Sequence, residues 1–441
     1  MEQQISQLGT YYKYPSPEEW DGILARPHKA ACELSQIVQA VIDKVRKEGD
    51  RAVRDYERQF DHVELTDLQV SQNEMEEAEK LISPELRDAL ELAHANIETF
   101  HAAQRFEGRR IETQPGVTCW QKAVPIERVG LYIPGGTAPL FSTVLMLATP
   151  ARIAGCKEIV LCSPPGKDGR LNPAILVAAR IAGVSKIYKV GGVQAIAAMA
   201  YGTESIPKTY KIFGPGNQYV VAAKQAVSLR DVAIDMPAGP SEVAVVADAT
   251  SNPEFVAADL LSQAEHGMDS QVLLVSTDEN MIESVRAEID RQLALLPRRD
   301  MAASSLSASR FILVHDTAEA MNLVNAYAPE HLILAVADYE NLAGRVVNAG
   351  SVFLGRYSCE SAGDYASGTN HTLPTNGYAK AYSGVSLDSF VRKVTFQELT
   401  AEGIRRIGPA VETMAANEQL EAHRRAMTVR LAEVNADSQK R

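Results

Sequence analysis

Gln263 and His266 are two polar side chains three residues apart, in the run LLSQAEHG at residues 260–267. The run closes a helical pattern that starts near Pro253, and Gly267 is typical of a helix stop. Residues three apart on a helix share a face, so we expect the amide and the imidazole to point the same way. Such a pair could hold a hard or borderline metal ion or a polar substrate. Taken alone, it is more often structural.

The segment APEH at residues 328–331 sets Glu330 directly beside His331. Because Pro329 cannot continue an uninterrupted ladder, we expect the pair to lie where a strand at residues 332–336 begins. An imidazole titrates near neutral pH and a carboxylate can activate a water, so the pair can move protons. The structural alternative is a capping Glu330 and a satisfied surface His331.

A long polar run, RYSCESAGDYASGTNHTLPT at residues 356–375, follows a β-rich segment and has no hydrophobic periodicity. A polar segment of this length inside a compact protein is usually functional or disordered. Its small residues suggest backbone close to a ligand, and Asp364 is a natural partner for a metal ion or an amine. His423 lies in the run EQLEAH near the C-terminus, where a lone histidine is usually structural.

Short β-rich runs alternate with helix-length segments from residue 129 onward, first up to residue 235 and again after the junction at residues 237–241. This alternation predicts two α/β blocks built on mostly parallel sheets, in which ligands lie at the carboxyl ends of strands. The strands expected in the first block are residues 129–133, 159–162, 186–190, 210–213 and 232–235. Those expected in the second are residues 243–246, 272–275, 311–314, 332–336 and 352–354.

Four strands of the first block lead into turns rich in glycine or proline, at residues 134–136, 163–166, 191–192 and 214–216. Such turns let backbone amides approach a phosphate or a ribose. None of them is a GxGxxG fingerprint or a phosphate loop, so a nucleotide site and ordinary loops remain equally open. Tyr132, Gln194 and Asn217 lie at or just after three of these strands, where ligand-facing residues are expected.

The remaining segments carry no chemistry that we can identify. Residues 17–105 are mostly helical, with Ser83-Pro84 a typical helix start, and we expect them only to pack. Strand signals begin at residues 117–120. Beyond residue 384 the pattern turns helical again and ends in a charged tail from about residue 418.

A chain of 441 residues with 46% hydrophobic and 23% charged content predicts two to four globular domains. The net charge of −12 without a basic cluster argues against nucleic-acid or anionic-membrane partners. We expect neither a membrane span nor a signal peptide. The cysteines suggest reduced thiols in the cytoplasm, because they are odd in number and scattered: Cys32, Cys119, Cys156, Cys162 and Cys359.

Together these segments resemble the histidinol dehydrogenase family, and the resemblance extends from about residue 41 to residue 423. Its most specific stretches are residues 124–138, 189–198, 213–217, 234–241, 262–267, 328–332 and 360–375. The resemblance implies oxidation of L-histidinol through L-histidinal to L-histidine, with two hydride transfers to two NAD. It further implies a homodimer, with one zinc per subunit.

The resemblance also assigns roles to residues. It implies that zinc orients the substrate and that His331 is the base that takes the hydroxyl proton. Glu330 would then activate water for attack on the aldehyde. The implied zinc ligands are Gln263, His266, Asp364 and His423, the last from the partner subunit. Further implied substrate contacts are Ser241, His331 and Glu418, in addition to the four zinc ligands. The implied cofactor contacts are Tyr132, Gln194 and Asn217.

The fold implied by the resemblance is two incomplete Rossmann-like domains plus small helical pieces near the ends. We expect an extension domain from residues 1–27 and 384–403, and a larger α/β domain with the zinc and acid/base residues from 28–131 and 242–383. Residues 132–241 would bind NAD, and residues 404–441 would reach the partner subunit, contributing Glu418 and His423. Cys359 stands where many relatives have proline, which bears on the stiffness of the loop.

Three alternatives remain open at this point. A relative on the same scaffold could oxidise another small polyol or amino alcohol, but the presence of Glu418 favours histidinol. An inactive zinc protein would have lost the Glu330–His331 pair, which this chain keeps. A nucleotide-binding module would leave the metal ligands and the polar run unexplained. Ligands of these types do not separate zinc sharply from manganese or cobalt.

Overall fold

The computed structural model describes residues 8–26, 32–135, 139–184, 186–237 and 239–439. Gly136 and Ala238, which belong to two of the predicted turns, therefore lie outside the described residues, as does the side chain of Cys32. The chain divides into two compact units, Met1–Gln104 with Ile126–Phe390, and Arg105–Pro125 with Val391–Arg441. The finer division into four segments stays a prediction. Within the described residues, no helix is both long and apolar enough to cross a membrane.

The first unit contains a five-stranded parallel sheet in the order β6-β5-β4-β7-β8. Alternate residues of each strand face opposite layers: Leu131 packs with α6 and α7, whereas Tyr132 and Cys162 pack with α8 and α9. The strands are β4 (Arg128–Tyr132), β5 (Glu158–Ser163), β6 (Lys186–Lys189), β7 (Lys211–Phe213) and β8 (Ala233–Ile234), and the helices are α6 (Phe141–Ala154), α7 (Pro173–Ile181), α8 (Gly192–Tyr201) and α9 (Gln218–Ser228).

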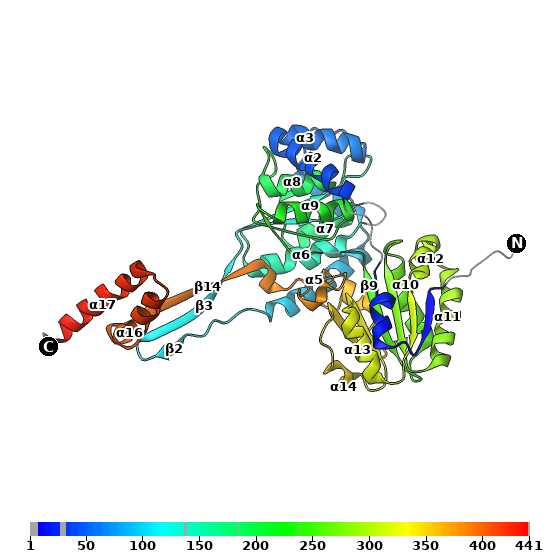
Figure 1. Ribbon diagram of the computed structural model, residues 1–441. Helices are drawn as coiled ribbons and strands as arrows, with labels where there is room; N and C mark the ends of the chain where they lie inside the picture. Colours follow the sequence, from blue (N-terminus) through cyan, green and yellow to red (C-terminus); the bar gives the residue numbers. More distant parts are fainter. Residues whose placement is uncertain (1–7, 27–31, 136–138, 185, 238, 440–441) are drawn as a thin grey trace. The chain divides into compact units, whose positions relative to one another are not determined.

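The same unit contains a six-stranded parallel sheet in the order β1-β11-β10-β9-β12-β13. Apart from the edge strand β1, its order repeats that of the five-stranded sheet, which supports the two Rossmann-like blocks. Figure 1 shows β9 beside the covering helices α10 and α13. The strands are β1 (Thr10–Lys13), β9 (Glu242–Ala247), β10 (Gln271–Ser276), β11 (Arg310–Leu313), β12 (His331–Ala335) and β13 (Ser351–Leu354).

Helices cover both faces of this second sheet. One face packs on α10 (Pro253–Ala264), α11 (Glu279–Leu293) and α12 (Arg299–Ser307). The other packs on α1 (Trp20–Ile23), α13 (Thr317–Tyr327) and α14 (Tyr339–Ala343). A short helix, α15 (Glu360–Tyr365), interrupts the polar run after β13. The predicted strands of both blocks are confirmed within one or two residues at each end.

The N-terminal helices are present as predicted, and they pack on the helices α6 to α9 that cover the five-stranded sheet. Ser83 caps α5 through the Leu86 amide, with Pro84 in the first turn. The helices are α2 (Cys32–Glu48), α3 (Asp50–Tyr56), α4 (Gln72–Leu81) and α5 (Pro84–Ala102), with a π-helical turn at Glu57–Asp61 after α3.

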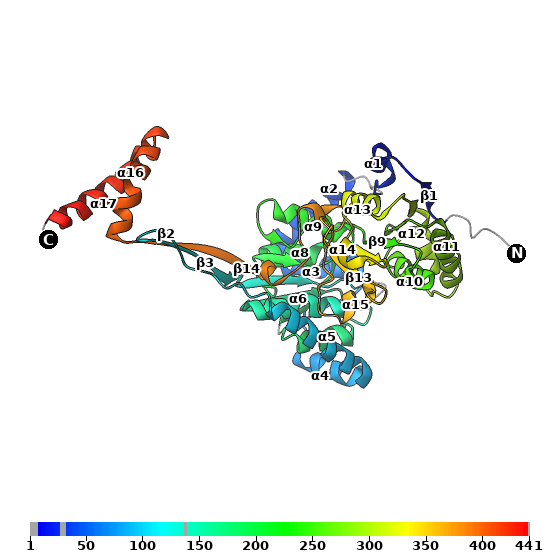
Figure 2. The same cartoon turned by 90° about the horizontal axis from the view of Figure 1, so that it is seen from below.

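The second unit holds a three-stranded antiparallel sheet and two helices that pack against each other (Figures 1 and 2). Its elements are β2 (Ile111–Gln114), β3 (Val117–Pro125), β14 (Val391–Leu399), α16 (Ala401–Asn417) and α17 (Glu421–Gln439). The prediction of helix beyond residue 384 is wrong for β14, which pairs with β3 over nine residues. That partner lies far away in the chain, and local periodicity cannot reveal it.

Candidate active site

Glu330 and His331 lie where α13 gives way to β12. Ala328 ends the helix in the left-handed conformation, with φ of +54°, and Pro329 follows it. His331 then opens β12 beside Val243 of β9. The predicted position at the start of the strand is confirmed. The pair thus occupies the amino end of this sheet, not the carboxyl end where ligands usually lie in parallel sheets.

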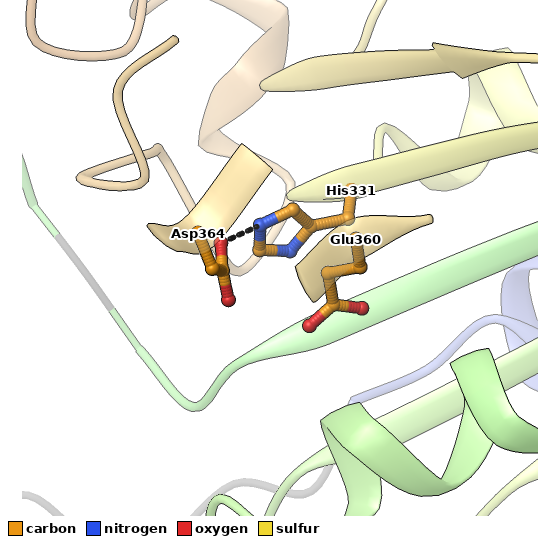
Figure 3. Close-up of side chains that lie close together, drawn as sticks. All are labelled: His331, Glu360 and Asp364. Atoms are coloured by element: carbon orange, nitrogen blue, oxygen red, sulfur yellow. Dashed lines mark ion pairs between the residues drawn. The ribbon is translucent and has the colours of Figure 1, made fainter. Parts of the chain in front are cut away.

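The ring of His331 is buried between a backbone carbonyl and a carboxylate. Its Nδ1 lies 3.2 Å from the carbonyl oxygen of Glu242, and its Nε2 lies 3.4 Å from Asp364 Oδ1 (Figure 3). Because a carbonyl only accepts, Nδ1 carries the hydrogen in the neutral ring, which leaves Nε2 free to take a proton. The ring therefore offers its basic nitrogen on the side of Asp364.

Glu330 is buried and points back to β9. Its Oε2 accepts a hydrogen bond from the Glu242 amide at 2.9 Å and lies 3.7 Å from His331 Nδ1. Burial raises the pKa of Glu330 to about 8, although the neighbouring His331 works in the opposite direction. A carboxyl with a pKa in this range can exchange protons near neutral pH.

Glu360, the first residue of α15, completes a cluster of three potential metal-binding side chains. Ligand atoms of His331, Glu360 and Asp364 lie within 4.8 Å of one another (Figure 3). Glu360 is only 1% exposed, and burial raises its pKa well above the ordinary value. Our sequence reasoning missed this residue. Its i, i+4 spacing from Asp364 was the available signal, but we treated the segment as a loop and not as a helix.

The cluster carries an excess of negative charge. Burial alone would lower the pKa of His331, but Glu360 and Glu330 outweigh it, and with Asp364 they raise the pKa to about 10. Asp364 Oδ1 and His331 Nε2 are buried and make no hydrogen bond among the described residues. The surplus of acidic groups and the two buried atoms without a hydrogen bond are both what a site for a cation requires.

Helix α10 ends at Ala264, so Gln263 lies in its last turn and His266 two residues beyond its end. The expectation that the two side chains share a face stays a prediction. Gln263 is 1% exposed. With its amide nitrogen turned toward Glu360, it donates to that carboxylate, and its oxygen accepts from the Glu242 amide at 3.1 Å. His266 is exposed. Burial raises the pKa of Asp364, but His331 outweighs burial and lowers it, and the charge of His266 contributes in the same direction as His331.

Three further predicted site residues lie outside this cluster: Ser241 precedes it in the sequence, and Glu418 and His423 follow it. Ser241 is half-buried and directly precedes β9. Glu418 and His423 belong to the second unit, where Glu418 caps α16 and His423 lies in the first turn of α17. Both are exposed at the turn between these helices. Their roles stay predictions.

The predicted cofactor residues gather around the carboxyl ends of the five-stranded sheet. The Tyr132 hydroxyl accepts from the Gly192 amide at 3.1 Å, and Gln194 is buried in the first turn of α8. Asn217 caps α9 through the amides of Tyr219 and Val220. Strands β4 and β7 are neighbours on which the strand order reverses, the usual place for a dinucleotide.

Glu57, in the π-helical turn, reaches this cofactor region. Its Oε1 accepts from the Gly191 amide at 3.0 Å and from Gln194 Nε2 at 2.8 Å. Burial raises its pKa to about 8, and the nearby Asp61 also raises it. The sequence analysis does not predict these contacts of Glu57, and the expectation that residues 17–105 only pack stays a prediction. No motif identifies it, because its partners follow it by more than 130 residues.

Comparison with known proteins gives consistent matches. The family model described as histidinol dehydrogenase matches residues 24–431. Histidinol dehydrogenase of Bacteroides fragilis is 68% identical over 422 residues, covering 96% of this chain and 99% of the relative. That of Escherichia coli is 52% identical over 417 residues, covering 94% and 95%. The crystal structure of histidinol dehydrogenase from Elizabethkingia anophelis superposes with a TM-score of 0.96 at 54% identity, covering 98% of this chain and 100% of that one.

Proposed function

This chain belongs to the histidinol dehydrogenase family of NAD-dependent oxidoreductases, which act in histidine biosynthesis, and from that premise we propose which of its residues carry the reaction. His331 Nε2 takes the hydroxyl proton of L-histidinol as hydride leaves. The orientation of the ring supports this role, since Nδ1 is committed to the Glu242 carbonyl at 3.2 Å. A cation bound beside the surrounding carboxylates would offset their charge and lower the His331 pKa from about 10, so that Nε2 could accept the proton. NAD, when bound, accepts the hydride in each of the two oxidations.

Glu330 activates the water that attacks the intermediate aldehyde. Its contact with the Glu242 amide at 2.9 Å fixes one carboxyl oxygen and leaves the other to hold water. A pKa of about 8 lets the group give up and take back a proton during turnover. The hydrate so formed loses the second hydride and becomes the carboxylate of histidine.

We propose that zinc is held by Gln263, His266, Asp364 and the partner subunit's His423. An amide oxygen, a carboxylate and two imidazoles are donors that zinc accepts. Asp364 Oδ1, which is buried and makes no hydrogen bond among the described residues, supports a cation at this place. Zinc, when bound, would polarise and orient the substrate. The buried carboxylates Glu330 and Glu360 favour a substrate that carries an amine, and Ser241 and Glu418 complete its contacts.

NAD binds, on this proposal, at the carboxyl ends of the five-stranded sheet, with Tyr132, Gln194 and Asn217 as its contacts. The reversal of strand order between β4 and β7 supports this location. Glu418 and His423 would come from a second copy of the chain, which makes the enzyme a homodimer. A cytoplasmic location remains a prediction from the free cysteines.

The deciding experiment measures NADH formed from L-histidinol at saturating NAD. We expect two NADH per histidinol, loss of activity after chelation and its return with zinc. His331→Asn should lower turnover by about 100- to 10,000-fold, the usual contribution of a general base. His315→Asn, at an exposed histidine paired with Glu319, is the matched control and should not change turnover. A fully active His331→Asn enzyme would contradict the proposed role.

A further inference from the structure

Glu242, the first residue of β9, contacts both members of the acid/base pair through its backbone. Its amide donates to Glu330 Oε2 at 2.9 Å, and its carbonyl accepts from His331 Nδ1 at 3.2 Å. The same amide lies 3.1 Å from the oxygen of Gln263. A small displacement of this one residue would therefore change the orientation of the carboxyl group and of the ring together.

The Glu242 side chain is held by Arg26, which lies far away in the sequence. Arg26 donates to Glu242 Oε1 through Nε at 2.5 Å and to Oε2 through Nη2 at 2.8 Å. The Asn376 amide donates to Oε1 at 2.8 Å. The Glu242 carboxylate is 3% exposed and the Arg26 side chain 15%. Two parallel hydrogen bonds between a guanidinium and a carboxylate fix both groups in position and orientation.

Arg26 also fixes the helix that leads into the pair. Its Nη2 donates to the carbonyl of Tyr327, the last residue of α13, at 2.8 Å. The guanidinium lies 4.1 Å from the centre of the Tyr327 ring, and the Tyr327 hydroxyl donates to Gln271 at 2.8 Å. Arg26 thus holds the chain on both sides of the site, three residues before Glu330 and at the start of β9.

Charge gives Arg26 a second effect. Glu242, Glu330 and Glu360 are all at most 6% exposed, and Asp364 lies within ion-pair distance of His331. Arg26 supplies a permanent positive charge to one of these carboxylates. Without it, Glu242 would keep a buried charge unpaired, and such groups move toward water or bind a proton.

We propose that Arg26 is a positioning residue for the oxidation, which acts through Glu242 to hold Glu330 and His331 in their working orientations. This rests on the roles proposed for Glu330 and His331. Removal of Arg26 should lower kcat by about 10- to 100-fold, the usual effect of losing a residue that orients reacting groups. NAD binds elsewhere, so its KM should not change.

The competing explanation is that Arg26 only anchors the N-terminal segment. Arg310 offers a matched control, because it donates to the carbonyl of Ile23 at 3.2 Å and makes no hydrogen bond to Glu242 in the described part of the chain. Arg310→Gln loosens the same segment three residues away and leaves the Arg26–Glu242 pair intact. It should therefore keep the wild-type kcat.

The experiment compares zinc-loaded wild type, Arg26→Gln, Arg26→Lys, Arg310→Gln and the double variant Arg26→Gln/Glu242→Gln, with His331→Asn as reference. The measurements are kcat, both KM values, zinc content and the ¹⁵N shifts of the histidine rings, which report the tautomer of His331. We expect Arg26→Gln to lower kcat and shift the His331 ring signal. Arg26→Lys should recover part of the loss, because an ammonium keeps the charge but not the paired hydrogen bonds.

The outcomes separate this proposal from the proposed function. Wild-type kcat in Arg26→Gln, together with an inactive His331→Asn, would overturn the positioning role alone. An equal loss in Arg310→Gln would also overturn it. An active His331→Asn would overturn the proposed function itself. If Arg26→Gln does not fold, the double variant, which leaves no unpaired charge, gives the same readout, and a wild-type kcat in it contradicts the proposal.

Discussion

At the scale of single residues, buried carboxyl groups dominate both functional regions. Glu330 and Glu360 surround His331, whereas Glu57 receives the amide of Gly191 and the side chain of Gln194. Burial raises the pKa of each of these carboxyl groups. Removing these carboxyl groups from water lowers the stability of the fold. They are nevertheless buried where they orient neighbouring polar groups, which indicates that their orientation matters more at these places than the stability that is lost.

Glu57→Gln should make the enzyme more stable at alkaline pH. The folded protein holds the Glu57 proton up to a pKa of about 8, whereas the unfolded chain releases it near 4.5. The stabilising effect of that proton is therefore complete below pH 4.5 and is lost as the pH rises to about 8. The amide variant keeps an acceptor for Gly191 and carries no charge. We expect it to gain on the order of 1–2 kcal/mol over wild type at pH 9.

Urea unfolding of both proteins at pH 6 and pH 9 measures this effect. Glu64→Gln is the control, because Glu64 is an exposed partner of Arg58 and should change stability little at either pH. Equal pH dependence in wild type and Glu57→Gln would contradict the prediction.

At the scale of elements, the active-site strand is held by a close backbone approach. A Cβ on Gly350 would lie 2.5 Å from the Glu330 carbonyl oxygen, and the Gly350 amide donates to the Pro329 carbonyl at 3.0 Å. Only a glycine lets the segment before β13 pass so near to the start of β12. The position of Glu330 and His331 thus depends on the absence of a side chain at Gly350.

Gly350→Ala should displace the start of β12. We expect kcat to fall about 100-fold, as for a misplacement of reacting groups by about 1 Å, and the free energy of unfolding to fall by about 1–3 kcal/mol. Gly344→Ala is the control, since its Cβ would meet only Asn341 O at 3.4 Å. Histidinol oxidation and urea unfolding test both variants, and wild-type turnover in Gly350→Ala would show that the strand can move without loss.

The sequence predicted the elements whose signals are local. Strand composition and glycine turns identified both sheets, and the short segment APEH placed Glu330 and His331 correctly at the start of β12. The errors share a physical cause, since they depend on partners far away in the chain. Strand β14 exists because β3 pairs with it, and Glu57 matters because it meets Gln194.

At the scale of the whole molecule, the second unit has little core of its own. Most residues of β2 and β14 are exposed, and α16 buries only Gly403, Ile404, Gly408 and Ala415. A small unit of this kind gains stability from a partner surface. This supports the proposed dimer, in which the turn that carries Glu418 and His423 serves the other subunit.

Two inactive variants should restore activity when they assemble together. In a mixed dimer of Asp364→Asn and His423→Asn, one site receives both defects and the other receives none. Co-expression should therefore recover about a quarter of wild-type activity, since about half of the dimers are mixed and each has one intact site. Histidinol oxidation by the purified mixture measures it.

The control pairs Asp364→Asn with Glu330→Gln. Both defects lie in the first unit, so each site of a mixed dimer keeps one of them and no activity should return. No recovery in the first mixture would mean that His423 acts within its own subunit. Recovery in the control would mean that Asp364 and Glu330 of one subunit serve different sites.

The predicted cofactor contacts and the pair of Glu330 and His331 lie on different sheets, which has a practical consequence for protein engineering. Tyr132 ends β4 and Asn217 follows β7 of one sheet, whereas Glu330 and His331 lie at the start of β12 in the other. On the proposed assignment of the NAD site, libraries confined to the segments after β4 and β7 can be screened for acceptance of a different nicotinamide coenzyme without changing Glu330 and His331. Recognition of the coenzyme and recognition of the alcohol can be evolved in separate campaigns and then combined in one gene.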